Sequence, residues 1–196
     1  MLGCEWLQYY LFFLIALFLT SLFFNLKQRQ IIKQKEQQDS TLIKKAYFNP
    51  ITDLPNKQNL EIMMNEQIHR AHRHKKKFVV GVVKILNYHD VLLRSHAVGE
   101  EFIIEAATRI SESLRDEDIV AHTTENGFVI LYNEYLEEDN SQIIFDRITN
   151  AFKESFEFNA KNILHFKISI GKAVYPTTAT TSEALINAAT REALKT

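Results

Sequence analysis

Residues 115–128 read RDEDIVAHTTENGF, and this stretch decides the fold. Two β-prone segments, residues 119–123 and 128–132, flank a short connection that ends in Asn126-Gly127. Asn-Gly between apolar runs is a strong signal for a β-hairpin, because both residues accept a positive φ. The stretch therefore predicts a pair of antiparallel strands within the fold.

Outside this hairpin, helices alternate with strands. Residues 78–86 form a nearly continuous apolar run rich in Val, as expected of a strand that is buried on both faces. Residues 164–175 alternate apolar and polar side chains and predict a second long strand. Apolar periodicity and capping signals predict helices at residues 57–74, 97–114, 139–156 and 180–194. This order predicts an α/β or α+β sandwich around a central sheet.

The composition excludes several classes of protein. The chain has 196 residues, and its 23 Lys+Arg against 24 Asp+Glu give a net charge of -1, which argues against nucleic acid as a partner. The single cysteine, Cys4, excludes an internal disulfide framework and a cysteine-based zinc site. His69, His72 and His74 do not share one helix face, so no metal site is expected there.

Residues 6–26, WLQYYLFFLIALFLTSLFFNL, carry no charge and predict a transmembrane helix. At ~1.5 Å per residue, a helix of this length spans about 30 Å, the thickness of a hydrocarbon core. A cleaved signal peptide fits less well, because no Lys or Arg precedes the apolar stretch. Basic residues follow it and only Glu5 precedes it, so we expect the N-terminus outside and the remaining chain in the cytoplasm.

Three parts of the chain follow from these patterns. Residues 1–27 are expected to be the membrane anchor, and residues 28–47 a polar helical linker. For this linker a solvated stalk and a dimerising helix both remain open, so a homodimer is one option. Residues 48–196 are long enough to bury one good core and are expected to form a single domain.

Four segments of this domain, taken in order, resemble the GGDEF domain of the diguanylate cyclase family. The resemblance covers about residues 46–196 and rests on NPITDLPNK (49–57), SHAVGEEFI (95–103), FKISIGKAVYP (166–176) and SEALINAATREALK (182–195). It implies an α+β fold of the nucleotidyl cyclase type, with a mostly antiparallel central sheet flanked by helices. The family joins two GTP molecules into cyclic di-GMP, a phosphoryl transfer that depends on metal ions.

The resemblance implies that the acids which hold those metals are missing from this chain. Lys84 and Leu86 stand at two acidic positions of the first strand, and Asn126 stands at the acidic position of the hairpin. A second alignment places Val83 and Ile85 in the strand positions and supplies no acid either. At an effective dielectric of ~20, a cation 4 Å from a metal ion costs about 4 kcal/mol per unit charge product. We therefore expect no catalytic residue, no metal, no cofactor and no enzyme activity.

The family's guanine contacts also change in this sequence. An Asn that contacts the base falls on Leu92 or Leu93, neither of which can read a base edge. Glu100 keeps an acid at a second guanine contact, although an ordinary exposed helix residue is an equal reading of it.

An Arg-x-x-Asp pair is the part of the family pattern that remains. In the family such a pair lies five residues before the signature and binds the product, cyclic di-GMP, and Arg115 and Asp118 match that spacing. The planar guanidinium can grip phosphate or guanine with two hydrogen bonds. Arg70, or Arg73 beside it, matches a second Arg that a partner domain supplies in some members. Solvated loop residues are the alternative interpretation of Arg115 and Asp118.

Three hypotheses of function follow from the resemblance. The first is a catalytically inactive cyclic di-GMP receptor in the bacterial inner (cytoplasmic) membrane, working through a membrane protein complex. The second is a ligand-independent scaffold of such a complex, for example in exopolysaccharide synthesis or secretion. The third is an enzyme of altered chemistry.

Overall fold

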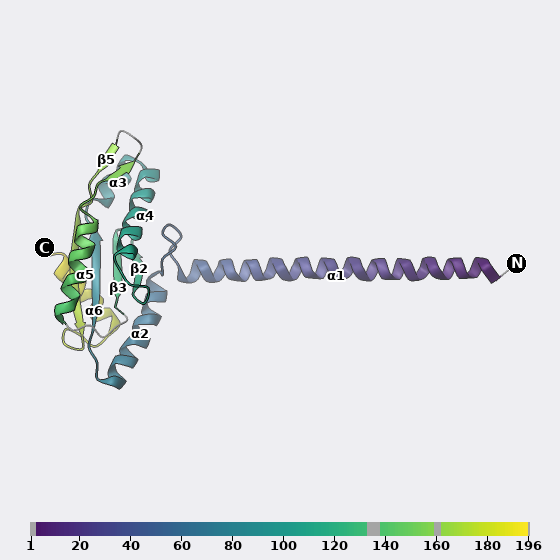
Figure 1. Cartoon of the computed structure of the whole chain (residues 1–196), viewed down its shortest axis with the longest axis horizontal. Coiled ribbons are helices and arrows are strands. Elements are labelled where there is room, and N and C mark those ends of the chain that lie inside the picture. The colour runs from purple at the N-terminus through teal and green to yellow at the C-terminus, as the bar shows by residue number, and fades with distance from the viewer. Residues whose placement is uncertain (1–2, 133–137, 159–161, 196) are drawn as a thin grey trace. The chain divides into compact units, whose positions relative to one another are not determined.

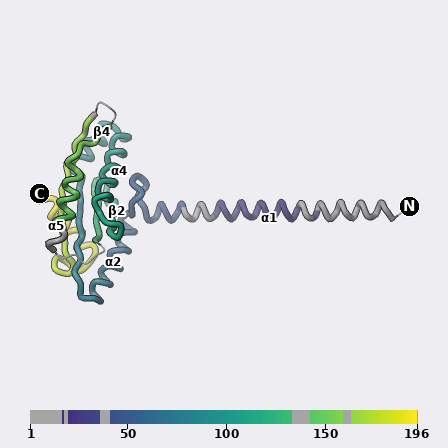
Figure 2. The backbone as a smooth tube through the Cα atoms, viewed as in Figure 1, coloured from purple at the N-terminus to yellow at the C-terminus, as the bar shows by residue number. Residues whose placement is uncertain are grey.

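The computed structural model describes the backbone of residues 3–132, 138–158 and 162–195. Side chains are described for residues 17, 20–35, 41–132, 142–158 and 163–195, and Figure 2 shows in grey the parts outside this set. The chain divides into two compact units, Met1–Ala46 and Tyr47–Thr196, so the domain begins one residue before the predicted boundary.

The first unit consists of one helix, α1 (Gly3–Tyr47). The predicted anchor and the predicted linker are thus continuous in backbone. Among the described residues, none of the helices combines the length and the apolar character that crossing a membrane requires. Most side chains of the predicted transmembrane segment, residues 6–26, lie outside the described residues.

The second unit is built on a four-stranded sheet with the strand order β2-β3-β1-β6 (Figure 1). The strands are β1 (Phe78–Ile85), β2 (Ile119–Thr124), β3 (Gly127–Leu131) and β6 (Ile168–Tyr175). All three pairings are antiparallel, with β1 between β3 and β6. The predicted α+β class with a central antiparallel sheet is therefore confirmed.

Helices cover both faces of this sheet. They are α2 (Lys57–His74), α3 (Tyr88–Arg94), α4 (His96–Glu112), α5 (Glu138–Ala151) and α6 (Ser182–Ala193). A small second sheet pairs β4 (Phe156–Phe158) with β5 (Asn162–Leu164). Several boundaries differ from the prediction. The helix predicted at 139–156 ends at Ala151, and Phe156 begins β4. Leu164 lies in β5 rather than in β6, and α6 is capped by Thr181 instead of Thr180.

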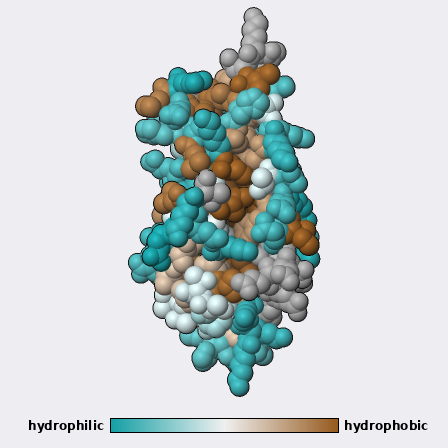
Figure 3. Space-filling model, turned by 90° about the vertical axis from the view of Figure 1, so that its left-hand side faces the viewer, coloured by the Kyte–Doolittle hydropathy of each residue, from teal (hydrophilic) through white to brown (hydrophobic). Residues whose placement is uncertain are grey.

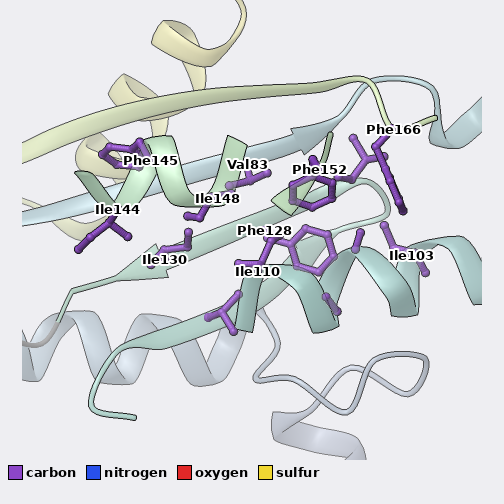
Figure 4. Close-up of a cluster of buried hydrophobic side chains, with 14 of the residues drawn as sticks. Val83, Ile103, Ile110, Phe128, Ile130, Ile144, Phe145, Ile148, Phe152 and Phe166 are labelled. Atoms are coloured by element: carbon purple, nitrogen blue, oxygen red, sulfur yellow. The ribbon is translucent and has the colours of Figure 1, made fainter. Parts of the chain in front are cut away.

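Alternation along β1 divides the core into two clusters. Val79, Val83 and Ile85 pack with side chains from α3, α4 and α5, whereas Val80 and Val82 pack with α2 and α6. Figure 4 shows the first cluster, where Phe128 and Ile130 of β3 point toward apolar side chains of α4 and α5. The nearly continuous apolar sequence of β1 is explained by this burial on both faces.

The predicted hairpin is present, but its turn is made differently. Thr124 pairs with Gly127, so only Glu125 and Asn126 connect the strands, and a bulge interrupts the register between His122 and Thr124. Among the described residues, only Asp53 and Lys75 have a positive φ. The expectation that Asn126 and Gly127 use a positive φ is therefore wrong, and the bulge supplies the twist that lets the strands pair.

Candidate functional site

The hairpin turn is tied to the end of β1 through Asn126. The Ile85 amide donates to the Asn126 backbone oxygen at 2.8 Å, and the Asn126 side-chain amide donates to the Ile85 oxygen at 3.1 Å. An ionised carboxylate in this place would have no proton to donate. Asn126 therefore holds the turn by a contact that an Asp could not make.

Lys84 lies beside the same turn. It pairs with Gly127 across the sheet, and a Cβ added to Gly127 would lie 3.8 Å from Lys84 Nζ. Val83 and Ile85, the residues of the second alignment, are buried in the first core cluster. Among the described residues, no group of three or more His, Cys, Asp or Glu is arranged to hold a metal ion. The turn therefore presents an ammonium and an amide where the resemblance expects carboxylates.

A hollow of about 550 Å³, here called the hairpin hollow, lies next to the turn. It is lined by residues from the loop at 49–56, from the first turn of α2, from α3 and α4, and from the hairpin. Leu92 and Glu100 both line it, whereas Leu93 does not and is 74% exposed. Of the two alternatives for the missing base contact, the structure thus places Leu92 in the hollow.

Carboxylates give the hairpin hollow a negative field on one side. The pKa of Tyr88, which lines the hollow, is raised first by burial and then by the charges of Glu125 and Glu100. Lys57 also lines the hollow and adds one positive charge. A phosphate chain that approached Tyr88 would be repelled by the same two carboxylates that raise its pKa.

His122 links the hairpin to the loop that enters the domain. Its ring is buried and stacks on Phe128 with centroids 4.6 Å apart. Nε2 lies 3.3 Å from the Glu125 backbone oxygen and Nδ1 lies 3.1 Å from Thr52 Oγ1. Because a carbonyl only accepts, this geometry fits a neutral ring with the proton on Nε2 and the Thr52 hydroxyl donating to Nδ1. Burial also lowers the pKa of His122.

No motif in the sequence pointed to this role of His122. The signal that could have found it is the strand alternation, because Val120 and His122 occupy the same face of β2 and a His there needs polar partners. The His122 amide also donates to the Pro55 oxygen at 2.9 Å. The junction between loop and hairpin thus rests on both the backbone and the ring of this residue.

Arg115 and Asp118 lie together at a second hollow of about 350 Å³, here called the Arg115 hollow. Its walls include Leu54, Met63 and Leu114, so apolar surface backs the two charged residues. The structure thus brings the predicted pair to one concave surface before β2. Such a surface suits a ligand that has both charged groups and flat apolar faces.

The loop itself uses part of Asp118. The Arg115 amide donates to Asp118 Oδ2 at 3.2 Å, and the Asp118 amide donates to the Arg115 oxygen at 3.0 Å. The Arg115 side chain is 51% exposed, and its Nη1 lies 4.0 Å from Glu117 Oε1. The guanidinium is therefore accessible to a ligand, while the Asp118 carboxylate also shapes the turn.

Arg70, the third predicted ligand residue, does not line the Arg115 hollow. It is exposed on α2, seven residues and about 10 Å of helix beyond Met63, which does line it. Within one domain the three residues are therefore not gathered around one point. A role for Arg70 from a second copy of the domain stays a prediction.

Comparison with models of protein families matches residues 46–196 to the family described as diguanylate cyclase, GGDEF domain. The chain belongs to this family. The match covers all four strands of the sheet, the hairpin and both hollows. The GGDEF domain is therefore the unit described here as Tyr47–Thr196.

Known members share the fold at low sequence identity. Diguanylate cyclase TpbB of Pseudomonas aeruginosa is 24% identical over 153 residues, which are 78% of this chain and 35% of TpbB. The chain thus spans about a third of the length of that curated relative. The structure of the TpbB GGDEF domain alone matches with a TM-score of 0.72 at 23% identity, covering 76% of this chain and 87% of that one.

A second solved structure extends the likeness of fold. It contains the coiled coil and GGDEF domain of DgcB from Caulobacter crescentus in complex with cyclic di-GMP. The TM-score is 0.73 at 12% identity, over 86% of this chain and 89% of that chain. At such identity the likeness shows the GGDEF fold alone.

Proposed function

We propose that this GGDEF protein takes part in cyclic di-GMP signalling as a receptor and does not condense GTP. The observation that carries the proposal is the contrast between two places at the ends of β2. At the Arg115 hollow, Arg115 and Asp118 lie together against apolar walls. At the hairpin turn, Lys84 and Asn126 occupy the positions at which the family resemblance expects acids.

The charges around the turn argue against phosphoryl transfer. Metal ions bridge and neutralise the phosphates in this chemistry, and carboxylate oxygens are their usual ligands. An ammonium at Lys84 repels a dication, and at an effective dielectric of ~20 this repulsion is about 4 kcal/mol per unit charge product at 4 Å. Glu100 and Glu125 repel the phosphates on the other side, as their effect on the pKa of Tyr88 indicates.

The Arg115 hollow offers chemistry that suits a guanine dinucleotide. The half-exposed guanidinium of Arg115 can donate two parallel hydrogen bonds to a phosphate or to the O6 and N7 atoms of guanine. The Asp118 carboxylate, whose Oδ2 accepts from the Arg115 amide, can also accept from guanine N–H groups. Leu54 and Met63 can contact a base plane. Arg70 would complete the site from the domain of a second copy.

The names of the relatives support this class of ligand. TpbB is named a diguanylate cyclase, and the DgcB structure is described as a complex with cyclic di-GMP. We carry the ligand, rather than the reaction, over to this chain, because the Arg-x-x-Asp pair is present and the acids are absent.

We also propose that residues 6–26 anchor the protein in the bacterial inner membrane, with the GGDEF domain in the cytoplasm. The support is the uncharged 21-residue sequence and the basic residues that follow it. Fusion of a reporter that is active only in the periplasm to the N-terminus, and to the C-terminus, would test this topology. Activity at the C-terminal fusion would contradict it.

Isothermal titration of the protein with cyclic di-GMP tests the receptor. We expect saturable heat in the micromolar range for wild type and a loss of at least ten-fold in affinity for Arg115→Ala, because one charge-assisted bidentate contact is worth about 1.5–3 kcal/mol. Arg94→Ala is the matched control, since Arg94 is an exposed arginine of α3 outside both hollows. Asp118→Asn is preferred to alanine, because the amide oxygen can still accept from the Arg115 backbone.

Two results would sink the proposal. The first is no heat for wild type at tens of micromolar, which would favour the ligand-independent scaffold. The second is formation of cyclic di-GMP when the protein is incubated with GTP and Mg²⁺ or Mn²⁺. Chromatography of the products would detect it.

A further inference from the structure

The outer edge of β6 is open over part of its length. β6 is the last strand of the sheet, with β1 on one side only. The Lys172 amide donates to Glu192 Oε2 at 2.8 Å and the Val174 amide donates to Thr178 Oγ1 at 3.0 Å, both away from β1. Because strand groups alternate with a period of two, the N–H and C=O groups of Ile168 and Ile170 also point away from β1.

These outward groups differ along the strand. At the Tyr175 end the edge is closed, because Thr178 both donates to and accepts from the groups of Val174. At Lys172 the Glu192 carboxylate accepts the amide proton in the place where the carbonyl of a further strand would stand. Within the described part of the chain, no hydrogen bond is recorded for the outward groups of Ile168 and Ile170.

A groove follows this open part of the edge. A hollow of about 310 Å³, here called the β6 groove, is lined by residues 168–172, by Phe145 and Asp146 of α5, and by Glu192 of α6. Figure 3 looks at the side of the molecule on which α5 lies and shows a hydrophobic hollow in its middle, bordered by hydrophilic side chains. An edge strand flanked by helices is the geometry in which proteins add an extended peptide as a further strand.

The two walls of the β6 groove call for different side chains on that peptide. Ile168 and Ile170 face the α5 side, where they pack against the first core cluster with Phe145. Gly171 faces α6 so closely that a Cβ there would meet the backbone of Ala189 and Ala193. Residues of an added strand that face α5 would therefore be apolar, and those that face α6 would be small.

The acidic side chains on the rims of the groove indicate that the added segment carries basic residues. Asp146 lies on the α5 rim and Glu192 on the α6 rim, against the one lysine of the lining, Lys172. An added strand would also take over the Lys172 amide from the Glu192 carboxylate. The carboxylates of Asp146 and Glu192 would repel an acidic segment.

We propose that the β6 groove binds an extended segment of a partner protein, in which apolar and small residues alternate between flanking basic residues, by adding it to β6 as a fifth strand. Its main-chain groups would bond to Ile168 and Ile170, and its terminal basic residues, which face the same side as its apolar residues, would lie near Asp146 on the α5 rim. A second copy of this chain fits less well, because it would bring the same Asp146 and Glu192 carboxylates to the edge.

Fluorescence anisotropy tests the proposal. The full chain is titrated into a labelled peptide of the sequence Lys-Thr-Val-Ser-Val-Thr-Lys. Two further peptides carry N-methyl groups on both Val amides or on both Thr amides. We expect one of these two to lose at least five-fold in affinity, because only one edge of the peptide faces β6 and each blocked hydrogen bond is worth about 1 kcal/mol. Equal binding of all three peptides, or no binding, would overturn strand addition.

Variants test the charge pairing. Asp146→Lys should weaken the Lys-ended peptide about three-fold and favour a Glu-ended one, whereas Glu61→Lys on α2, outside the groove, should change neither. An unchanged preference in Asp146→Lys would contradict the predicted basic flanks. Ile170→Pro removes an outward amide together with a side chain that packs against the first core cluster. If this variant stays folded by circular dichroism and keeps its peptide affinity but loses a dimer in sedimentation velocity, the edge pairs with a second copy and the proposal is wrong.

Discussion

Replacing Arg109 tests the packing of α4 against the segment that leads from α5 into β4. The Arg109 guanidinium donates to three backbone oxygens of that segment, from Nη1 to Ala151 at 3.1 Å and to Glu154 at 2.6 Å, and from Nη2 to Ser155 at 3.1 Å. The side chain is only 11% exposed. A single buried fork therefore bonds to the last carbonyl of α5 and to two carbonyls of the loop that follows it.

The expected loss of unfolding free energy follows from these contacts. Each bond to a backbone oxygen contributes about 1 kcal/mol net, because water can reach part of this segment once the fork is gone. The guanidinium also lies 4.9 Å from the Phe166 ring centre, and Nε lies 2.8 Å from Glu105 Oε1, contacts worth about 0.5–1 and about 0.3–0.5 kcal/mol. We expect Arg109→Ala to lower the free energy of unfolding by about 4 kcal/mol, a large share of the ~5–15 kcal/mol of a typical domain.

Arg109→Lys separates charge from geometry. The compact ammonium keeps the charge but cannot span three carbonyls in the plane of a fork, so we expect a loss of about 2 kcal/mol. Urea denaturation of residues 47–196, followed by circular dichroism, measures both variants. Arg94→Ala is the control and should stay within about 0.5 kcal/mol of wild type. A loss below about 1 kcal/mol for Arg109→Ala would refute the reasoning.

Three further outcomes can be measured in the same way. Gly171→Ala should lower the free energy of unfolding by about 2–3 kcal/mol, because the added Cβ meets the backbone of α6 at Ala189 and Ala193 and the helix must move away from the sheet. His122 should make stability fall as the pH falls below 6.5, because burial lowers its pKa and the unfolded chain then binds the proton first. The slope is at most about 1.4 kcal/mol per pH unit, and His122→Phe should remove it in denaturation series at pH 7.5, 6.5 and 5.5. Tyr132→Phe should be neutral or stabilising by up to about 1 kcal/mol, since the buried hydroxyl has no hydrogen-bond partner among the described residues.

Local patterns predicted the elements whose structure depends on local chemistry. The helix at Lys57–His74 was predicted at both ends, because Asn56 caps it at Asn59 N and the chain then reverses at Lys75. The strand Phe78–Ile85 followed from its apolar run, since it is buried on both faces. The hairpin followed from its Asn-Gly signal, although the bulge that makes its turn was not visible in the sequence.

Elements that depend on distant contacts were missed. The helix Tyr88–Arg94 is too short to show an apolar period, and it is held by Tyr88 and Val91 in the first core cluster. The roles of His122 and Arg109 depend on partners that lie far away in sequence, at Thr52 and at residues 151–155. No local pattern contains such contacts, so the sequence could not assign these two side chains.

The hairpin contacts bear on whether one substitution could restore the family's chemistry. Asn126 holds the turn by donating to the Ile85 oxygen, so Asn126→Asp would set a carboxylate 3.1 Å from a carbonyl and would weaken that hold. Lys84 would still place its ammonium beside Gly127. On the proposed function, Asn126 thus stabilises the turn in the place where a metal-binding acid would stand. A gain of GTP turnover would then require changes at both Lys84 and Asn126, together with new support for the turn.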